Sequence, residues 1–256
     1  MRNLMGSLVI ACSMYSRIPM PKVQWTKERM KYVMCFFPLI GLVIGICLWA
    51  WGQIAGVLGL GLLSYCLGGT LLPLGITGGI HMDGFLDVSD ARSSYGEPEK
   101  KLEILKDPHV GAFAVIKGSM YLFLYLAVFS ELPVSRLPAM GAVFVITRAM
   151  SGLSVVLFPK ARKEGLAAAF SQGARERIVS GIMAVYFMGC LAFLFMHEGW
   201  ETAAAAGGVS AVLFWRYYRI AVKEFGGMTG DLAGWFLQCT ELALMAVIAI
   251  LSRTAG

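Results

Sequence analysis

The chain has 256 residues, of which 57% are hydrophobic and 15% charged, and its formal net charge is +6. A soluble domain normally carries about a quarter charged residues, so this composition excludes an ordinary soluble protein. The positive charge does not indicate nucleic acid binding, because in a membrane protein its distribution matters more than its sum. The six scattered cysteines form no C-x-x-C pair, so neither a disulfide framework nor a zinc site is predicted.

Apolar segments recur along the chain at lengths near the roughly 20 residues that cross a bilayer. The first, 4–15, is short and is expected to be an interfacial or re-entrant helix. The expected crossings that follow are 33–52, 55–77, 112–130, 137–158, 179–197, 202–220 and 233–251. The predicted fold is therefore an all-α, polytopic integral membrane protein with about seven transmembrane helices. No repeat or low-complexity linker divides the chain, so a single domain over 1–256 is expected.

Lysine and arginine gather on one side of these crossings. Almost all of the 22 lie in the segments 1–32, 78–117, 159–178 and 216–232. Arg136 and Arg253 lie on the other side, and Arg148 lies within a crossing. By the positive-inside rule, the N-terminus and these four segments face the cytoplasm. The loops expected to carry chemistry are 78–111, 159–178 and 223–232.

Three aspartates follow the second long apolar segment in the stretch GGIHMDGFLDVSDARSSYG, residues 78–96. Asp83, Asp87 and Asp90 are spaced i, i+4, i+7, which places them on one face of a helix. Like charges so close together destabilise a helix unless a cation compensates them, and Mg²⁺ prefers such carboxylate oxygens. The alternative is a solvated acidic face, neutralised by Arg92 or Lys100.

Two histidines lie near these carboxylates in the sequence. His81 precedes Asp83 by two residues, and Asp107 and His109 close the same loop in KDPHVGAF. A histidine beside carboxylates is a candidate general base or metal ligand. The alternative is that both histidines are ordinary polar loop residues.

The stretch EFGGMTGDLAGW, residues 224–235, leads into the last apolar segment. Backbone N–H groups at a helix start suit a phosphate, which makes Gly227, Thr229 and Gly230 candidate contacts. The alternative is helix capping by Thr229 or Asp231 after a glycine-rich turn.

Two charged residues fall inside expected crossings. Arg148 lies in VFVITRAMSG, and Glu241 lies about two turns into the last helix. Ionisable groups within a bilayer are kept for pairing or for function, so these two form either a structural pair or a substrate contact. In the basic loop 158–177, Arg162 is a candidate phosphate ligand, although part of that charge is topogenic.

These segments together resemble the cobalamin synthase family, the adenosylcobinamide-GDP ribazoletransferases. The residues that carry the resemblance are SRIPMP (16–21), FFPLIGLVIG (36–45), TGGIHMDGFLDVSDA (77–91), KLEILKDPHVGAFAV (101–115), PKARKEGLAAAF (159–170) and GGMTGDLAGWFLQCTEL (226–242). The resemblance implies a Mg²⁺-dependent transferase of the final assembly step of vitamin B12. It joins adenosylcobinamide-GDP to α-ribazole or its 5′-phosphate by a phosphotransferase-type displacement and releases GMP.

Roles follow from the resemblance together with the patterns above. Asp83, Asp87 and His81 are the expected catalytic residues. The expected metal ligands are Asp83, Asp87 and Asp90, with Asp107 and Asp231 as candidates for a second cluster. The expected substrate contacts are Lys106, His109, Arg148, Arg162, Gly227, Thr229, Gly230 and Glu241. The implied location is the bacterial cytoplasmic membrane, with the lipid bilayer as partner and self-association or contact with neighbouring cobamide-pathway enzymes left open.

Two other functions are compatible with a membrane protein of this composition. The CDP-alcohol phosphotransferases carry a related D-G-x₂-A-R motif, which Asp83 and Gly84 echo without the A-R dipeptide. A transporter should instead carry polar residues and broken helices near the bilayer midplane, where only Arg148 and Glu241 are clearly placed.

Overall fold

The computed structural model describes residues 2–161 and 175–254, and within these ranges the chain is helical and forms no strand. The helices are α1 (Arg2–Tyr15), α2 (Lys27–Met30), η1 (Val33–Phe36), α3 (Phe37–Val57), α4 (Leu62–Thr77), α5 (Ile80–Ser93), α6 (Pro98–Ile104), α7 (Ala112–Ser130), η2 (Val134–Arg136), α8 (Leu137–Leu157), α10 (Glu176–Glu198), α11 (Trp200–Phe225) and α12 (Gly230–Thr254).

The all-α, multi-pass membrane class is confirmed, with fewer clear crossings than expected. Among the described residues, five helices are long and apolar enough to span a bilayer, or six if the bent pair α4–α5 counts as one span. These five are η1 with α3, α7, η2 with α8, α10 and α12. The sixth expected crossing, 202–220, falls in α11, which is long but carries Arg216, Arg219 and Lys223 in its second half. Those charges lower its hydropathy below that of the other long helices.

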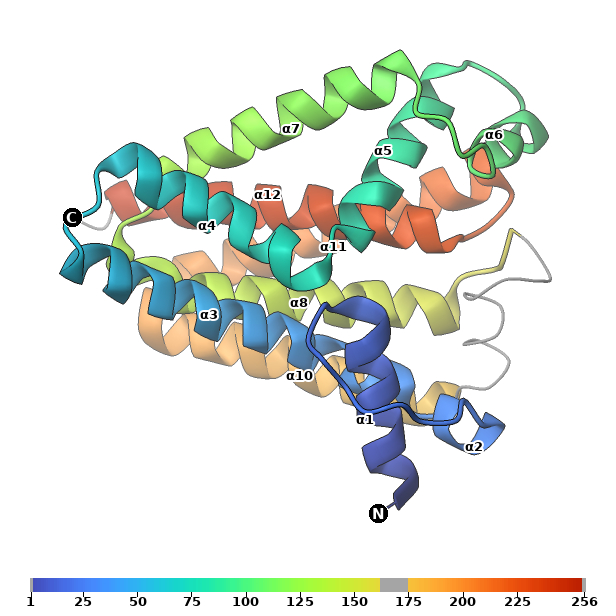
Figure 1. The fold of residues 1–256 in the computed structure, drawn as a ribbon, viewed down its shortest axis with the longest axis horizontal. Coiled ribbons are helices and arrows are strands. Elements are labelled where there is room, and N and C mark those ends of the chain that lie inside the picture. The colour runs from blue at the N-terminus through green and yellow to red at the C-terminus, as the bar shows by residue number, and fades with distance from the viewer. Residues whose placement is uncertain (1, 162–174, 255–256) are drawn as a thin grey trace.

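The long helices run along the longest axis of the molecule, and α5 crosses them steeply at one end (Figure 1). Helix α8 lies in the middle of the bundle, packed against α3, α10 and α12. Its side chains from Ala142 to Gly152 are buried on every face, as in a helix surrounded by other helices. This central helix therefore supports the end of the bundle that carries the functional site.

A sharp bend separates α4 from α5. Gly78 and Gly79 both have positive φ, at 67° and 80°, a conformation that side chains larger than glycine rarely adopt. The two helices meet there at 95°. The segment expected as a loop, 78–111, therefore contains the helices α5 and α6, and the bend turns α5 across the end of the bundle.

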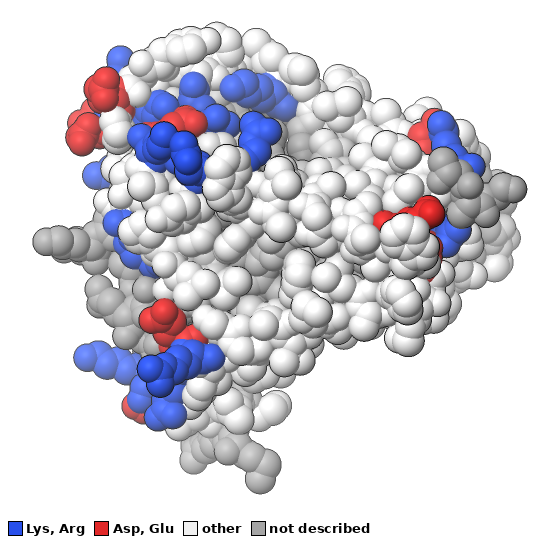
Figure 2. Space-filling model, turned by 180° about the vertical axis from the view of Figure 1, so that it is seen from behind, with Lys and Arg blue, Asp and Glu red and all other residues white. Residues whose placement is uncertain are grey.

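Charged side chains divide the surface into two ends and an apolar middle. In Figure 2, Lys and Arg gather at the end that carries α6, and smaller charged groups lie at the opposite end. At that opposite end Arg136 pairs with Glu198, and Arg253 pairs with Glu131. The uneven distribution agrees with the charge asymmetry of the sequence.

Candidate active site at the junction of α5 and α12

Helix α5 presents the three aspartates, as their spacing predicts. Asp83 is exposed, and Asp87 and Asp90 are half-buried. The other face of the helix is anchored by Phe85, Val88 and Ala91, which are buried in the core. None of the ion pairs between described residues involves Asp83, Asp87 or Asp90. Within the described part of the chain, these three aspartates therefore have no cationic side chain in an ion pair with them.

The start of α12 brings a fourth carboxylate to this face. A Cβ atom built on Gly84 would lie 2.7 Å from the backbone oxygen of Asp231, so the two backbones touch at this glycine. Asp87 experiences the charges of Asp83, Asp231 and Asp90. The structure thus joins Asp231 to the α5 cluster, although more than a hundred residues separate them in sequence.

Arg92, considered above as a residue that neutralises the aspartates, pairs with a different carboxylate. Arg92 donates to both carboxylate oxygens of Glu224, at 3.1 and 2.9 Å, and Lys101 donates to the same carboxylate at 3.1 Å. Burial raises the pKa of Glu224, but these bonds outweigh it and leave the pKa below its ordinary value. The cluster ties α5, α6 and α11 together and leaves the aspartates to other partners.

A cavity of about 250 Å³ opens beside the acidic face. Its lining residues come from α1, η1, α3, α5, α8, α12 and the turn before α12: Met14, Tyr15, Met34, Phe37, Ile80, His81, Asp83, Ser151, Val155, Met228, Gly230, Asp231, Ala233 and Gly234. Asp83 and Gly230 are exposed, whereas Met34, Phe37 and Val155 are buried. The cavity therefore has a polar solvent side and an apolar interior.

His81 lies inside this cavity and not in a solvated loop. Its side chain is 5% exposed, and its Nε2 atom is buried without a hydrogen-bond partner. The ring stacks on Tyr15 at 6.1 Å between centroids and lies 5.6 Å from the ring of Phe37. An unpartnered buried nitrogen is costly, so it marks a place where a ligand or water would be stabilised.

The glycine-rich turn before α12 caps that helix and also contacts the segment that follows α8. The Thr229 hydroxyl accepts a hydrogen bond from the N–H of Leu232 at 3.2 Å, which is the geometry of a helix cap. Met228 N–H donates to the Pro159 carbonyl at 2.8 Å, and Ala161 N–H donates to the Met228 carbonyl at 3.1 Å. Gly227 lies in this bridge and Gly230 lines the cavity.

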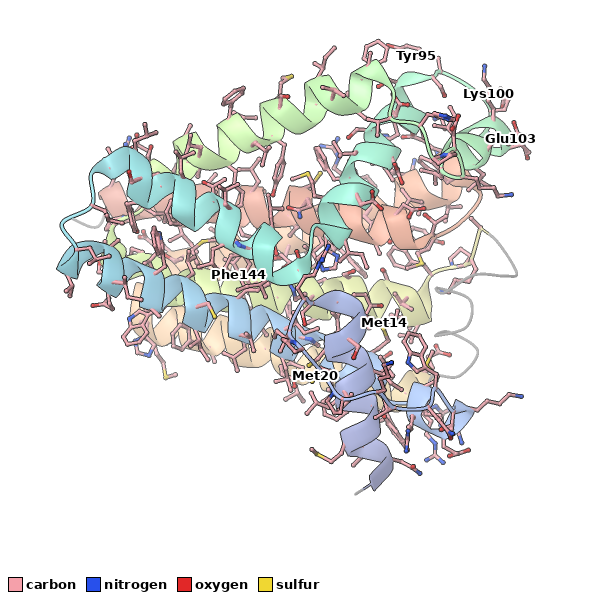
Figure 3. The ribbon with its side chains drawn as sticks, in the orientation of Figure 1. Met14, Met20, Tyr95, Lys100, Glu103 and Phe144 are labelled. Carbon is pink, nitrogen blue, oxygen red and sulfur yellow. The ribbon has the colours of Figure 1, made fainter. Side chains whose placement is uncertain are left out.

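Arg148 and Glu241 form an ion pair in the interior of the bundle. The Arg148 Nη1 to Glu241 Oε1 distance is 2.6 Å, and the side chains are 1% and 2% exposed. The guanidinium also lies over the ring of Phe144, at 5.7 Å, and Figure 3 places Phe144 between α4 and α8. The ion pair required by one of the two alternatives, a structural pair, is therefore present. A second, narrow cavity of about 10 Å³ separates the pair from His81 and Tyr121.

The loop after α6 lies at the charged end, where Figure 3 shows Tyr95, Lys100 and Glu103 pointing outward. His109 donates from its backbone N–H to Asp107, and its ring lies 2.7 Å from the same carboxylate. These bonds hold the pKa of Asp107 below its ordinary value. No hydrogen bond or ion pair among the described residues joins Lys106 or Asp107 to the α5 aspartates. Arg162 lies outside the described residues.

Comparison with known proteins assigns the family. The model of the family described as cobalamin-5-phosphate synthase matches residues 7–249. The chain belongs to the cobalamin-5-phosphate synthase family. It is 44% identical to the adenosylcobinamide-GDP ribazoletransferase of Lachnoclostridium phytofermentans, over 95% of this chain and 94% of that protein. It is 31% identical to the proteins of that name from Clostridium botulinum, over 94% and 96%, and Desulfitobacterium hafniense, over 94% and 95%. No solved structure matches the chain.

The acidic face of this cobalamin-5-phosphate synthase family member fits a hard divalent cation in the chemistry of its donors. Carboxylate oxygens are the ligands that Mg²⁺ prefers, and Mg²⁺ commonly keeps several waters or substrate phosphates as further ligands. Among the described residues, however, no three histidine, cysteine or carboxylate side chains converge into a ready metal site. The donors that lie together are Asp83, Asp87, Asp90 and Asp231, while Asp107 pairs with His109.

Several residues that line the cavity were not predicted from the sequence. Tyr15 and Met14 belong to the N-terminal helix, whose apolar character indicates only burial or a membrane interface. Ser151 lies on α8 and donates toward the Ala233 carbonyl at 3.5 Å. Glu224, which lies outside the cavity lining, was also missed, although an acidic residue within a basic segment is a signal for an ion pair.

Proposed function

We propose that this protein is an adenosylcobinamide-GDP ribazoletransferase of the bacterial cytoplasmic membrane. It would join adenosylcobinamide-GDP to α-ribazole or to α-ribazole 5′-phosphate and release GMP. Family membership and the names of the relatives support this proposal. The observation that carries it is the meeting of the α5 aspartates with Asp231 beside a cavity of about 250 Å³.

The reaction is a displacement at phosphorus. The 3′-hydroxyl oxygen of ribazole forms a bond to the phosphorus that carries cobinamide, and the bond from that phosphorus to the GMP oxygen breaks. The hydroxyl proton passes to a base, and GMP departs with the electron pair. Such transfers need positioning and charge stabilisation more than covalent catalysis, which suits a site built from carboxylates and a helix start.

Different residues of the site would serve different parts of this reaction. Asp83, Asp87, Asp90 and Asp231 would hold Mg²⁺, which when bound neutralises phosphate charge. Asp83, Asp231 and His81 line the cavity and would be the candidates for the base that takes the hydroxyl proton. The positive end of the α12 dipole at Gly230 favours a phosphate group. Lys106 and Arg162 stay predicted phosphate contacts.

The site is proposed to face the cytoplasm, where nucleotide substrates are made. The support is the charge distribution, because the end that carries α5 and α6 is the end rich in Lys and Arg (Figure 2). The reacting groups would then meet at the inner membrane surface.

The test is reconstitution of the reaction with purified protein in detergent. Adenosylcobinamide-GDP, α-ribazole and Mg²⁺ are supplied, and cobalamin and GMP are quantified by chromatography and mass spectrometry. We expect the two products in equal amounts, and no release of CMP when CDP-diacylglycerol replaces adenosylcobinamide-GDP. A folded protein that forms no cobalamin would contradict the proposal.

A further inference from the structure

The interior of the 250 Å³ cavity beside α5 differs in character from its rim. Pockets for whole drug-sized ligands are about 300–1,000 Å³, so this cavity accommodates only part of a large substrate. Its interior is formed by Met14, Met34, Phe37 and Val155, and Figure 3 shows Met14 where the end of α1 approaches α8. Methionine and aromatic side chains suit a flat apolar ring.

One of the polar side chains that line this cavity carries an unpartnered atom. The Nε2 atom of His81 is buried and has no hydrogen-bond partner, on a side chain that is 5% exposed. The neighbouring rings of Tyr15 and Phe37, 4.3 Å apart between centroids, flank the imidazole. A ligand that brought a single acceptor atom beside this nitrogen would remove the cost of its burial.

From this arrangement we infer that the cavity is the subsite for the aromatic base of the incoming nucleoside. This inference rests on the proposed function. Tyr15, Phe37, Met14 and Met34 would enclose the benzimidazole ring of ribazole, and His81 Nε2–H would donate to its unsubstituted ring nitrogen. The ribose would then lie on the solvent side, with its hydroxyl beside Asp83 and Asp231. His81 is thereby a binding residue, and the proton passes to a carboxylate.

Guanine, the other ring in the reaction, suits this interior less well. Its edge carries several hydrogen-bond donors and acceptors, and burial without partners makes each of them unfavourable. Apart from the two carboxylates at the rim, the polar side chains that line the cavity are His81, Ser151 and Tyr15. A dimethylbenzimidazole ring presents one acceptor and two methyl groups, which matches an apolar interior with one unpartnered nitrogen.

Filling the cavity provides the first test. Val155 is buried in its lining, so Val155→Phe should occupy the space of the ring. Binding of radiolabelled α-ribazole, measured by equilibrium dialysis without the second substrate, should weaken at least about ten-fold. The matched control is Leu157→Phe, because Leu157 is exposed near the same end of α8 and does not line the cavity. Its affinity should stay within about two-fold of wild type.

Enlarging the cavity provides a second test that does not depend on stability. Met14→Ala should shift the ratio of kcat/KM values toward a nucleoside with a larger tricyclic base, relative to α-ribazole, by at least about five-fold. A ratio measured on one protein sample cancels any loss of folded enzyme. An unchanged ratio, together with unchanged α-ribazole binding by the folded Val155→Phe variant, would overturn the inference.

Replacing His81 separates a binding role from a proton-transfer role. We expect His81→Ala to raise KM for α-ribazole at least about ten-fold with kcat within about three-fold of wild type. His81→Gln should recover most of the affinity, because its amide nitrogen reaches about the position of Nε2. A loss of kcat in both variants with unchanged KM would show that His81 is the base and overturn its assignment to the ring.

The outcomes distinguish this inference from the proposed function. If Val155→Phe loses α-ribazole binding but wild type forms no cobalamin, the subsite stands and the proposed reaction fails. If cobalamin forms and Val155→Phe instead weakens binding of GMP, guanine occupies the cavity and the inference fails.

Discussion

Gly84 on α5 and Asp231 at the start of α12 are in direct backbone contact. A Cβ atom at position 84 would lie 2.7 Å from the Asp231 oxygen and 2.9 Å from its Cα atom. Neither neighbour is a flexible side chain that could move aside. This contact fixes how far Asp231 lies from the aspartates of α5, and so fixes the width of the proposed metal and phosphate site.

Gly84→Ala should therefore push the two helices apart. We expect a loss of about 1–3 kcal/mol in stability, the usual effect of overpacking, together with weaker apparent Mg²⁺ activation. Thermal unfolding in detergent and the Mg²⁺ dependence of cobalamin formation measure the two effects. Gly75→Ala is the control, because a Cβ atom there meets nothing within 4 Å. Equal behaviour of the two variants would contradict the role of the contact.

Removal of one carboxylate from the acidic face should reduce turnover. Asp83→Asn keeps the size of the side chain but removes its charge, and we expect cobalamin formation to fall at least about 100-fold. Chelation of divalent cations should abolish activity in wild type, and added Mg²⁺ should restore it. Asp107→Asn is the comparison, because Asp107 is exposed and bonded to His109. If Asp107→Asn is the more damaging change, the loop after α6 belongs to the metal site.

The buried pair of Arg148 and Glu241 permits a double-variant test. Arg148→Met leaves Glu241 uncompensated in the bundle interior and should cost about 3–5 kcal/mol of stability. Adding Glu241→Leu should recover most of that loss, because the remaining buried charge is removed. Stability is measured by thermal unfolding in detergent. A stable double variant that forms cobalamin supports a purely structural pair, whereas a stable and inactive one supports a substrate contact.

The Glu224 cluster should produce a pH-dependent contribution to stability. Arg92 and Lys101 hold the pKa of Glu224 below its ordinary value of 4.5, so the contribution is present above that pH. It is lost as the pH falls from about 4.5 through the lowered pKa of the folded protein. Glu224→Gln should cost about 1–2 kcal/mol at neutral pH, and its difference from wild type should shrink in acid.

Unfolding midpoints of the two proteins between about pH 6.5 and about pH 3.5 measure this difference. Glu28→Gln is the control, because it removes only the exposed pair with Lys31 and should change stability little. A difference between Glu224→Gln and wild type that does not depend on pH would rule out the charge as its cause.

The sequence predicted the parts of the site that depend on local periodicity. The spacing of Asp83, Asp87 and Asp90 predicted a helix, and α5 covers all three. The membrane class followed from apolar segment lengths, and the charged end followed from the positions of Lys and Arg. These features are local, so composition and spacing are enough to predict them.

Other features depend on contacts between distant segments, which spacing does not encode. The burial of His81 requires Tyr15 from α1 and Phe37 from α3 to pack around it. The ion pair of Arg92 with Glu224 could not be predicted from spacing, because it requires α11 to lie beside α5. Fewer described helices meet the length and hydropathy of a span than expected, because α11 has the length of a span but carries charges along its second half.

The two sides of the cavity have a kinetic consequence. Asp83 and Gly230 lie on its solvent side, and the buried lining residues lie behind them. Adenosylcobinamide-GDP, with its diphosphate bound across the solvent side, would close the passage to the interior. A ring that binds in the interior must then enter first, so the two substrates should add in a fixed order, with the nucleoside leading and the corrinoid following. The product, which carries both, can leave only after GMP has vacated the rim.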